Sequence, residues 1–430
     1  MRSGNTAAPL FVVSLALLAC QDGERPRRVA PPAPAKVAPE DDGFHKLRSK
    51  PEASKPVGEV PAAVLAAAVE RSNAASFSLW RAFAEQANFV VSPYSIRSAL
   101  ALVYLASLPG NGRSSLRTGL RYPENNDDLD IRLLDGAVQA SAEARFESAN
   151  AVWVTRKDAL SPTYLYAVSR FLPAEVHSIG FAADPGRAQG VINAWVSDRT
   201  RGKIPQILEG NAIKNTTRTV LVNAVYFFGK WSSPFDPKLT APKPFRTSQG
   251  ATVQANTMVG ATCLAVFGDV YRAAIAAYLG TSLGFVVIVP ERWREFRWDA
   301  AAFRRVWGAL SGSDEAALEL PKFSLRSREK LVRVLRELDL ELRDPRLLQG
   351  LLASNEKTFI DVAVHEAFIR VDETSTEAAA ATAITEVPEM EIEPPPVFRV
   401  DRPFYFLLVE RRTGLIVLMG QMTNPTAAGG

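Results

Sequence analysis

The chain has 430 residues, of which 47% are hydrophobic and 22% charged, and its formal net charge is +4. This is the composition of a globular protein, and so small a net charge gives no electrostatic case for a nucleic-acid partner. The two cysteines, Cys20 and Cys263, and the three histidines, His45, His177 and His365, lie too far apart in the sequence for a structural zinc site. We expect no metal, no cofactor and no enzymatic activity, because histidines are scarce and neither a phosphate-binding Gly-rich loop nor an HExxH motif is present.

Residues 1–20 have the pattern of an export signal. Arg2 precedes an apolar run from Leu10 to Ala19, which is too short to cross a bilayer and fits the core of a signal peptide. The run ends in Leu-Leu-Ala-Cys, which resembles a bacterial lipobox, a motif whose cysteine, here Cys20, carries the lipid. The alternative is an ordinary secretory signal with a coincidental cysteine. We therefore expect a protein of the bacterial cell envelope, lipid-anchored at the outer membrane or cell surface, or an extracellular one.

Residues 21–60 are rich in proline, alanine and charge, with almost no large apolar side chains. Such a segment cannot bury a core, so the sequence predicts a disordered tether. Contact with the membrane would then be made only through the N-terminal lipid. With Cys20 carrying lipid, Cys263 has no partner for a disulfide within the chain.

From residue 61 to residue 426 we find no further Pro-rich linker and no internal repeat, which predicts a single domain. Apolar periodicity predicts helices over 61–86, 92–107 and 192–200, the second with Ser92 as N-cap and Pro93 at its first position. Apolar runs predict strands over 88–91, 219–231, 283–290, 318–325, 358–373, 403–410 and 415–422. The 358–373 strand would be far longer than usual and is expected in the middle of a large sheet. Early helices and late strands favour an α+β fold with mostly antiparallel sheets.

Six segments in order along the chain resemble one known family. They are NFVVSPYSI (88–96), INAWVSDRTRGKIPQIL (192–208), TVLVNAVYFFGKWSSPF (219–235), LELPKFSL (318–325), FRVDRPFYFLLV (398–409) and MGQMTNP (419–425). Together they are similar to the serpins, a family of serine protease inhibitors, over residues 61–426. The resemblance implies three β-sheets, about nine helices and an exposed reactive-centre loop. Residues 373 to about 398 would form that loop, the bait for a protease.

In this family the cleaved loop inserts into the main sheet as a new strand. A strand alternates its faces, so every second loop residue must enter the core. With Thr376 as the first, the inward residues are Thr376, Ala378, Ala380, Thr382 and Ile384, all uncharged, while Glu377, Ala379, Ala381 and Ala383 point outward. The resemblance makes Glu373 the hinge glutamate, and Ser375 stands where inhibitory members usually carry glycine. Serine takes up the hinge turn less freely than glycine, which would slow insertion.

The resemblance also implies a reactive bond at the family's usual spacing from the hinge glutamate, which falls at Glu389–Met390 or at Met390–Glu391. The first implies a Glu-specific serine protease as partner, and the second an elastase-like or chymotrypsin-like one. Residues 373–396 contain six glutamates and neither lysine nor arginine, which argues against a trypsin-like target. We expect the protein to be a monomer.

The resemblance also implies two supporting clusters. Ser92, Ser95, Asn223 and His365 match the shutter beneath the centre of the main sheet, and Trp231 and Lys322 match the breach where insertion begins, Lys322 pairing with Glu373. His365 is alternatively an ordinary buried histidine, and a catalytic Ser92–His365 pair lacks an acidic third member.

Two functions remain open on these residues. One is inhibition of a serine protease by suicide-substrate trapping, favoured by the small residues from Ala378 to Ala381. The other is a non-inhibitory serpin that acts as a binding module or cleavable decoy, favoured by Ser375.

Overall fold

The computed structural model describes residues 45–46, 61–124, 131, 133–136, 138, 144–155, 160–336, 338, 340–341, 344–354, 356–373 and 394–427. The chain divides into two units, residues 1–42 and 43–430, and every described residue belongs to the second. The expected signal, with Cys20, and most of the expected tether lie outside the described residues. So does the segment 374–393, which carries most of the expected loop.

Several of the described helices begin at a side-chain cap. Ser92, Asp184 and Asp299 each accept a hydrogen bond from a backbone N–H of the first turn that follows, as N-caps do. None of the described helices is long and apolar enough to cross a membrane. The helices are α1 (Ala62–Trp80), α2 (Pro93–Ala106), α3 (Asn111–Leu120), α5 (Pro162–Phe171), α6 (Pro185–Arg199), α7 (Ala300–Leu310) and α8 (Leu331–Arg336), with 3-10 turns at Pro345–Leu348 and Pro425–Ala427.

Two helices differ in length from the sequence prediction. The helix predicted over 61–86 is too long, because α1 ends at Trp80 and residues 81–85 form turns. These turns bury Phe83, whose ring stacks on Phe89 with centroids 5.7 Å apart. The helix predicted over 192–200 is too short, because α6 already begins at Pro185, capped by Asp184.

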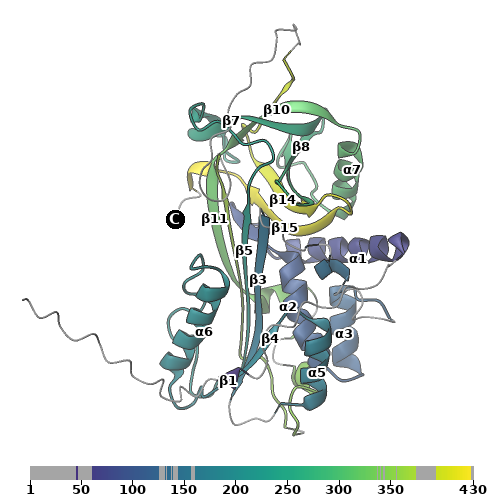
Figure 1. The fold of residues 1–430 in the computed structure, drawn as a ribbon, viewed down its shortest axis with the longest axis vertical. Coiled ribbons are helices and arrows are strands. Elements are labelled where there is room, and N and C mark those ends of the chain that lie inside the picture. The colour runs from purple at the N-terminus through teal and green to yellow at the C-terminus, as the bar shows by residue number, and fades with distance from the viewer. Residues whose placement is uncertain are drawn as a thin grey trace, which may run out of the picture. The chain divides into compact units, whose positions relative to one another are not determined.

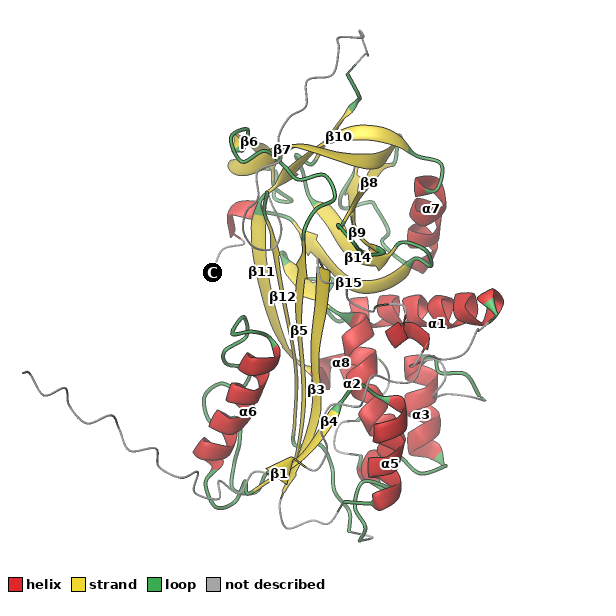
Figure 2. Cartoon of the chain, viewed as in Figure 1, coloured by secondary structure: helices red, strands yellow, loops and turns green. Residues whose placement is uncertain are grey.

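The first sheet (Figure 1) has six strands in the order β1-β4-β3-β5-β12-β11. Figure 2 shows β3, β5, β12 and β11 running side by side, with α6 on one side of the sheet and α2 and α5 on the other. The strand β5 pairs antiparallel with β3 but parallel with β12. The bounds are β1 (His45–Lys46), β3 (Ala144–Thr155), β4 (Glu175–Ile179), β5 (Thr219–Gly229), β11 (Phe323–Lys330) and β12 (Val362–Val371).

The remaining strands form a nine-stranded network in the order β13-β10-β7-β8-β9-β14-β15-β2, with β6 also paired to β7. The long strand β7 joins two parts of it, since residues 252–265 pair with β6 and β10 and residues 264–267 pair with β8. The three sheets of the expected fold are therefore the six-stranded sheet and two further sheets within the network, which are connected through β7. The bounds are β2 (Phe89–Val91), β6 (Ala241–Arg246), β7 (Thr252–Phe267), β8 (Tyr271–Ala277), β9 (Leu283–Pro290), β10 (Asp314–Pro321), β13 (Val397–Arg399), β14 (Phe404–Glu410) and β15 (Leu415–Met422).

The structure confirms an α+β fold with mostly antiparallel pairing and corrects two of the predicted strands. The strand predicted over 318–325 is two strands, because the chain leaves β10 at Pro321 and enters β11 of the other sheet at Phe323. Lys322 lies at this corner, and its backbone N–H donates to Asn256 O at 2.8 Å. The strand predicted over 358–373 is also too long, since β12 has ten residues; it lies between β5 and the last strand, β11.

Candidate functional site

The expected shutter residues meet beneath the centre of the six-stranded sheet. His365 of β12 and Asn223 of β5 are direct partners in the parallel ladder, and the Nδ1 of His365 hydrogen-bonds to the Oδ1 of Asn223. Asn223 Nδ2 donates to Ser95 Oγ at 2.6 Å. The backbone N–H of Ser92 donates to His365 Nε2 at 3.3 Å. Residues of β5, β12 and the start of α2 are therefore joined by one buried polar network.

Two members of this network were missed by the sequence analysis, and both lie on β3. Asn150 is the register partner of Asn223 and accepts a hydrogen bond from its Nδ2. Ser148 accepts a hydrogen bond from Asn150 Nδ2 at 3.1 Å and lies 2.8 Å from Ser95 Oγ. The sequence did carry one signal for Asn150, because this amide lies within an apolar run typical of a strand. A buried polar side chain in such a run needs a hydrogen-bond partner.

The contacts of His365 define its protonation state. Nε2 accepts from the Ser92 backbone, so Nδ1 carries the proton and donates to Asn223, as in a neutral imidazole. Burial lowers the pKa of His365 to about 3. Ser92 Oγ donates to Val417 O at 2.6 Å and accepts from Ser95 N at 3.1 Å, so it caps α2 and does not form a Ser–His catalytic pair.

The expected breach residues meet where β12 ends. Trp231 is buried against Tyr278, with ring centroids 4.5 Å apart, and its Nε1 donates to Asp372 O at 2.8 Å. Lys322 Nζ lies 2.8 and 3.2 Å from the two carboxylate oxygens of Glu373. Burial alone would raise the pKa of Glu373, but the hydrogen bonds to its carboxylate, first among them the one from Lys322, together outweigh burial, so the pKa of Glu373 lies below its usual value. The start of the expected hinge is thus held by a tryptophan and a lysine.

The arrangement of β5 and β12 gives this site its geometry. The two strands pair in parallel over seven residue pairs, from Val362–Val220 to Phe368–Tyr226. Two residues beyond the end of β12, Glu373 leads into residues 374–393, and the described chain resumes before β13, which pairs in parallel with β10. The parallel ladder therefore joins two strands, β12 and its neighbour β11, to β5 and the remaining strands of the sheet, and β12 leads directly into this segment.

Comparison with known proteins identifies the family. The family model described as serpin (serine protease inhibitor) matches residues 70–425. This chain belongs to the serpin family. It is 33% identical over 378 residues to an uncharacterised serpin-like protein of Thermococcus kodakarensis, covering 83% of this chain and 85% of that protein. It is also 29% identical over 366 residues to the leukocyte elastase inhibitor of Bos taurus, covering 79% of this chain and 93% of that protein.

The solved structures of serpins have the same fold. Native tengpin, a thermophilic serpin, superposes with a TM-score of 0.75 at 18% identity, covering 89% of this chain and 99% of tengpin. This likeness establishes the fold and supports the α+β architecture read from the sequence. The structure of this serpin brings together Ser92, Ser95, Asn223 and His365, and separately Trp231, Lys322 and Glu373.

The remaining expected residues of this serpin lie outside the described part of the chain. They are the reactive-bond residues Glu389 and Met390, and the hinge residues Ser375, Thr376, Ala378, Ala379, Ala380, Ala381 and Thr382. Their roles stay predictions.

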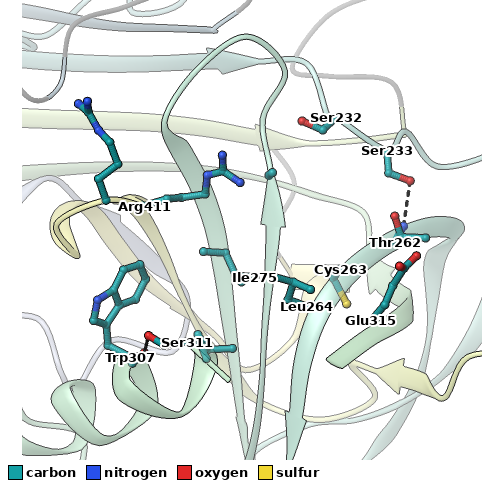
Figure 3. A pocket seen from close by; sticks show the side chains of 13 residues that line it. Ser232, Ser233, Thr262, Cys263, Leu264, Ile275, Trp307, Ser311, Glu315 and Arg411 are labelled. Atoms are coloured by element: carbon teal, nitrogen blue, oxygen red, sulfur yellow. Dashed lines mark hydrogen bonds between the residues drawn. The ribbon is translucent and has the colours of Figure 1, made fainter. Parts of the chain in front are cut away.

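A cavity of about 580 Å³ lies between β7, β8 and α7, and Ser232, the neighbour of Trp231 in the chain, is one of its lining residues. Figure 3 shows Cys263, Ile275 and Trp307 along its wall. The thiol of Cys263 donates to Ala316 O at 3.6 Å, and burial raises its pKa to about 12. Cys263 is therefore a buried, protonated thiol rather than a reactive one.

Proposed function

We propose that this serpin inhibits a serine protease by suicide-substrate trapping, in which the cleaved loop inserts between β5 and β12. The observation that carries the proposal is the parallel pairing of β5 and β12 together with the position of the expected loop directly after β12. The family description and the name of the bovine relative support protease inhibition.

The ladder geometry supports insertion at this boundary. A strand that turns back after Glu373 runs antiparallel to β12, and it also runs antiparallel to β5, because β5 and β12 are parallel. Insertion would replace one parallel ladder with two antiparallel ladders, which are slightly more stable per residue. The buried network around Asn223 and His365 joins the two strands across this boundary, so it must rearrange as the sheet opens.

The side chains of residues 376–384 suit the new strand. The inward positions Thr376, Ala378 and Ala380 are small and uncharged, whereas Glu377 falls on the outward face. A slip of one residue would bury Glu377 without a partner, at a cost of several kcal/mol.

The expected partner is a serine protease, and the alternative reactive bonds divide the candidates. Cleavage at Glu389–Met390 corresponds to a Glu-specific enzyme, and cleavage at Met390–Glu391 to an elastase-like or chymotrypsin-like one. The name of the bovine relative favours an elastase-like enzyme as the first to try.

The test is incubation with a panel of serine proteases, followed by denaturing electrophoresis and mass spectrometry of the released peptide. A trapping inhibitor gives a complex that survives boiling in detergent, and the peptide mass identifies the bond. Ala380→Arg at an inward position should still be cleaved but should no longer form the complex. Ala381→Arg, its outward neighbour, is the matched control and should trap as the wild type does. Equal trapping by the two variants would contradict insertion.

The second candidate function is that of a non-inhibitory serpin, a binding module or cleavable decoy. Ser375 favours it, because serine at this hinge position restricts the turn that insertion needs. Cleavage of the wild type at the expected bond by every active protease, without any stable complex, would support this function instead.

A further inference from the structure

The chain between α6 and β5 crosses the boundary at which the loop would insert. We call residues 200–213 the crossing segment. Its apolar side chains are buried in one cluster with residues of β5 and with Val364 of β12: Ile204, Ile207, Leu208 and Ile213. The crossing segment therefore packs on both sides of the β5–β12 boundary.

Two arginines of β11 attach the crossing segment to the far side of that boundary. Arg326 Nη2 donates to Lys203 O at 2.6 Å. Arg328 Nη2 donates to Gln206 O, and its Nη1 forms an ion pair with Glu209. Hydrogen bonds of this kind, made by a charged donor, are stronger than those between neutral groups.

A buried carboxylate on β12 orients both arginines. Glu366 is fully buried, and its oxygens lie 2.6 Å from Arg328 Nε and 3.4 Å from Arg326 Nη1. Arg328 and Glu366 are direct partners in the antiparallel ladder of β11 and β12. Burial raises the pKa of Glu366, and the bond to Arg328 opposes that rise. The three charged side chains thus belong to one strand pair and move with it.

A cavity of about 560 Å³ lies beside these contacts, and its lining includes Leu208, Glu209, Arg328 and residues 362–364 of β12. Apolar packing between the crossing segment and the strands is therefore incomplete there.

Insertion of a strand would move β12 and β11 away from β5 by one strand spacing, about 4.8 Å. A hydrogen bond of 2.6 Å cannot survive such a displacement, whereas the pairing of Glu366 with the arginines can, because β11 and β12 move together. We propose that Arg326, Arg328 and Glu366 form a clasp on the crossing segment that must release before the sheet accepts a new strand. The clasp would set the rate of loop insertion, and this inference rests on the proposed function.

The experiment measures sheet opening without a protease. A synthetic acetylated peptide with the sequence of residues 374–387 is incubated with the intact full-length protein, and its incorporation is followed by native gel electrophoresis. The test variant is Arg326→Lys/Arg328→Lys. Lysine keeps a positive charge beside Glu366 but lacks the planar fork that bonds a carboxylate and a carbonyl together. We expect peptide incorporation to be at least tenfold faster than in the wild type.

The matched control is Arg201→Lys. Arg201 also belongs to the crossing segment, but it pairs with Glu147 of β3 at 3.2 Å, on the side of the boundary already held by α6. This variant should incorporate the peptide at the wild-type rate. A second test variant, Glu209→Lys, places a like charge beside Arg328 at an exposed position and should accelerate incorporation about threefold.

The outcomes separate the clasp from the proposed function. Equal incorporation rates in the wild type and the double lysine variant would overturn the clasp. If the double lysine variant does not fold, the clasp is overturned by a Glu209→Lys variant that incorporates the peptide at the wild-type rate. Incorporation by the wild type without any stable protease complex would count against the proposed function alone, because the clasp is judged on the rates. If no variant takes up the peptide, both proposals are wrong.

Discussion

The buried imidazole of His365 predicts a specific loss of stability in acid. The folded protein holds His365 neutral, with a pKa of about 3, whereas an unfolded chain protonates histidine near pH 6.5. Protonation in the folded state would place a second N–H at Nε2, facing the Ser92 N–H that now donates to it at 3.3 Å. Between these two pKa values the unfolded state binds one more proton, so the free energy of unfolding falls as the pH falls from about 6.5 to about 3.

The size of this effect follows from the two pKa values. Proton binding by His365 favours the unfolded state, because only the unfolded chain takes up the proton in this range. Integrating this uptake from pH 7 to pH 5 lowers the free energy of unfolding by about 2 kcal/mol. Below pH 3 the effect is complete, and above pH 6.5 it is absent.

The perturbation is His365→Gln, which removes the titrating group but keeps one donor for Asn223 and one acceptor for the Ser92 N–H. Urea denaturation of both proteins at pH 7 and pH 5 gives the free energies of unfolding. The wild type should lose about 2 kcal/mol more than the glutamine variant over this range, because all other titrating groups are shared. An equal loss in the two proteins would show that His365 is not held neutral, and the account of the buried network would be wrong.

Three further predictions concern the loop, the hinge and the anchor. A single cut near Glu389 should raise the melting temperature by about 6 °C for every 5 kcal/mol that insertion releases; an unchanged melting temperature by differential scanning calorimetry would mean that the loop does not insert. Lys322→Met should lower the free energy of unfolding by less than about 1 kcal/mol, since the lysine of its ion pair with Glu373 is partly exposed; a loss of free energy larger than this in urea denaturation would contradict the prediction. Cys20→Ser should release the protein from membranes, and failure of the wild type to label with a palmitate analogue would rule out the lipid anchor.

Local sequence was sufficient for the elements whose signals are contained within them. Ser92 caps α2 and Pro93 opens it as predicted, because an N-cap needs only the residues of the first turn. The strands β9 and β15 have the predicted bounds 283–290 and 415–422, since each is a short apolar run with turn residues at its ends. The shutter and breach residues came from the family resemblance, and the structure brings them together as that resemblance implied.

The partners that lie far apart in the sequence were decided by the tertiary structure alone. Asn150 is separated from Asn223 by 73 positions, and only the register of β3 against β5 makes them neighbours. The division of 318–325 at Lys322 depends on which sheet each half joins, and an apolar run carries no information about that choice. The contacts of Arg328 with Glu366 and Gln206 likewise need β11, β12 and the crossing segment to be in place. Periodicity determines which side chains share a face of one strand, but the free energy of burial and pairing across the whole sheet decides which faces and edges meet.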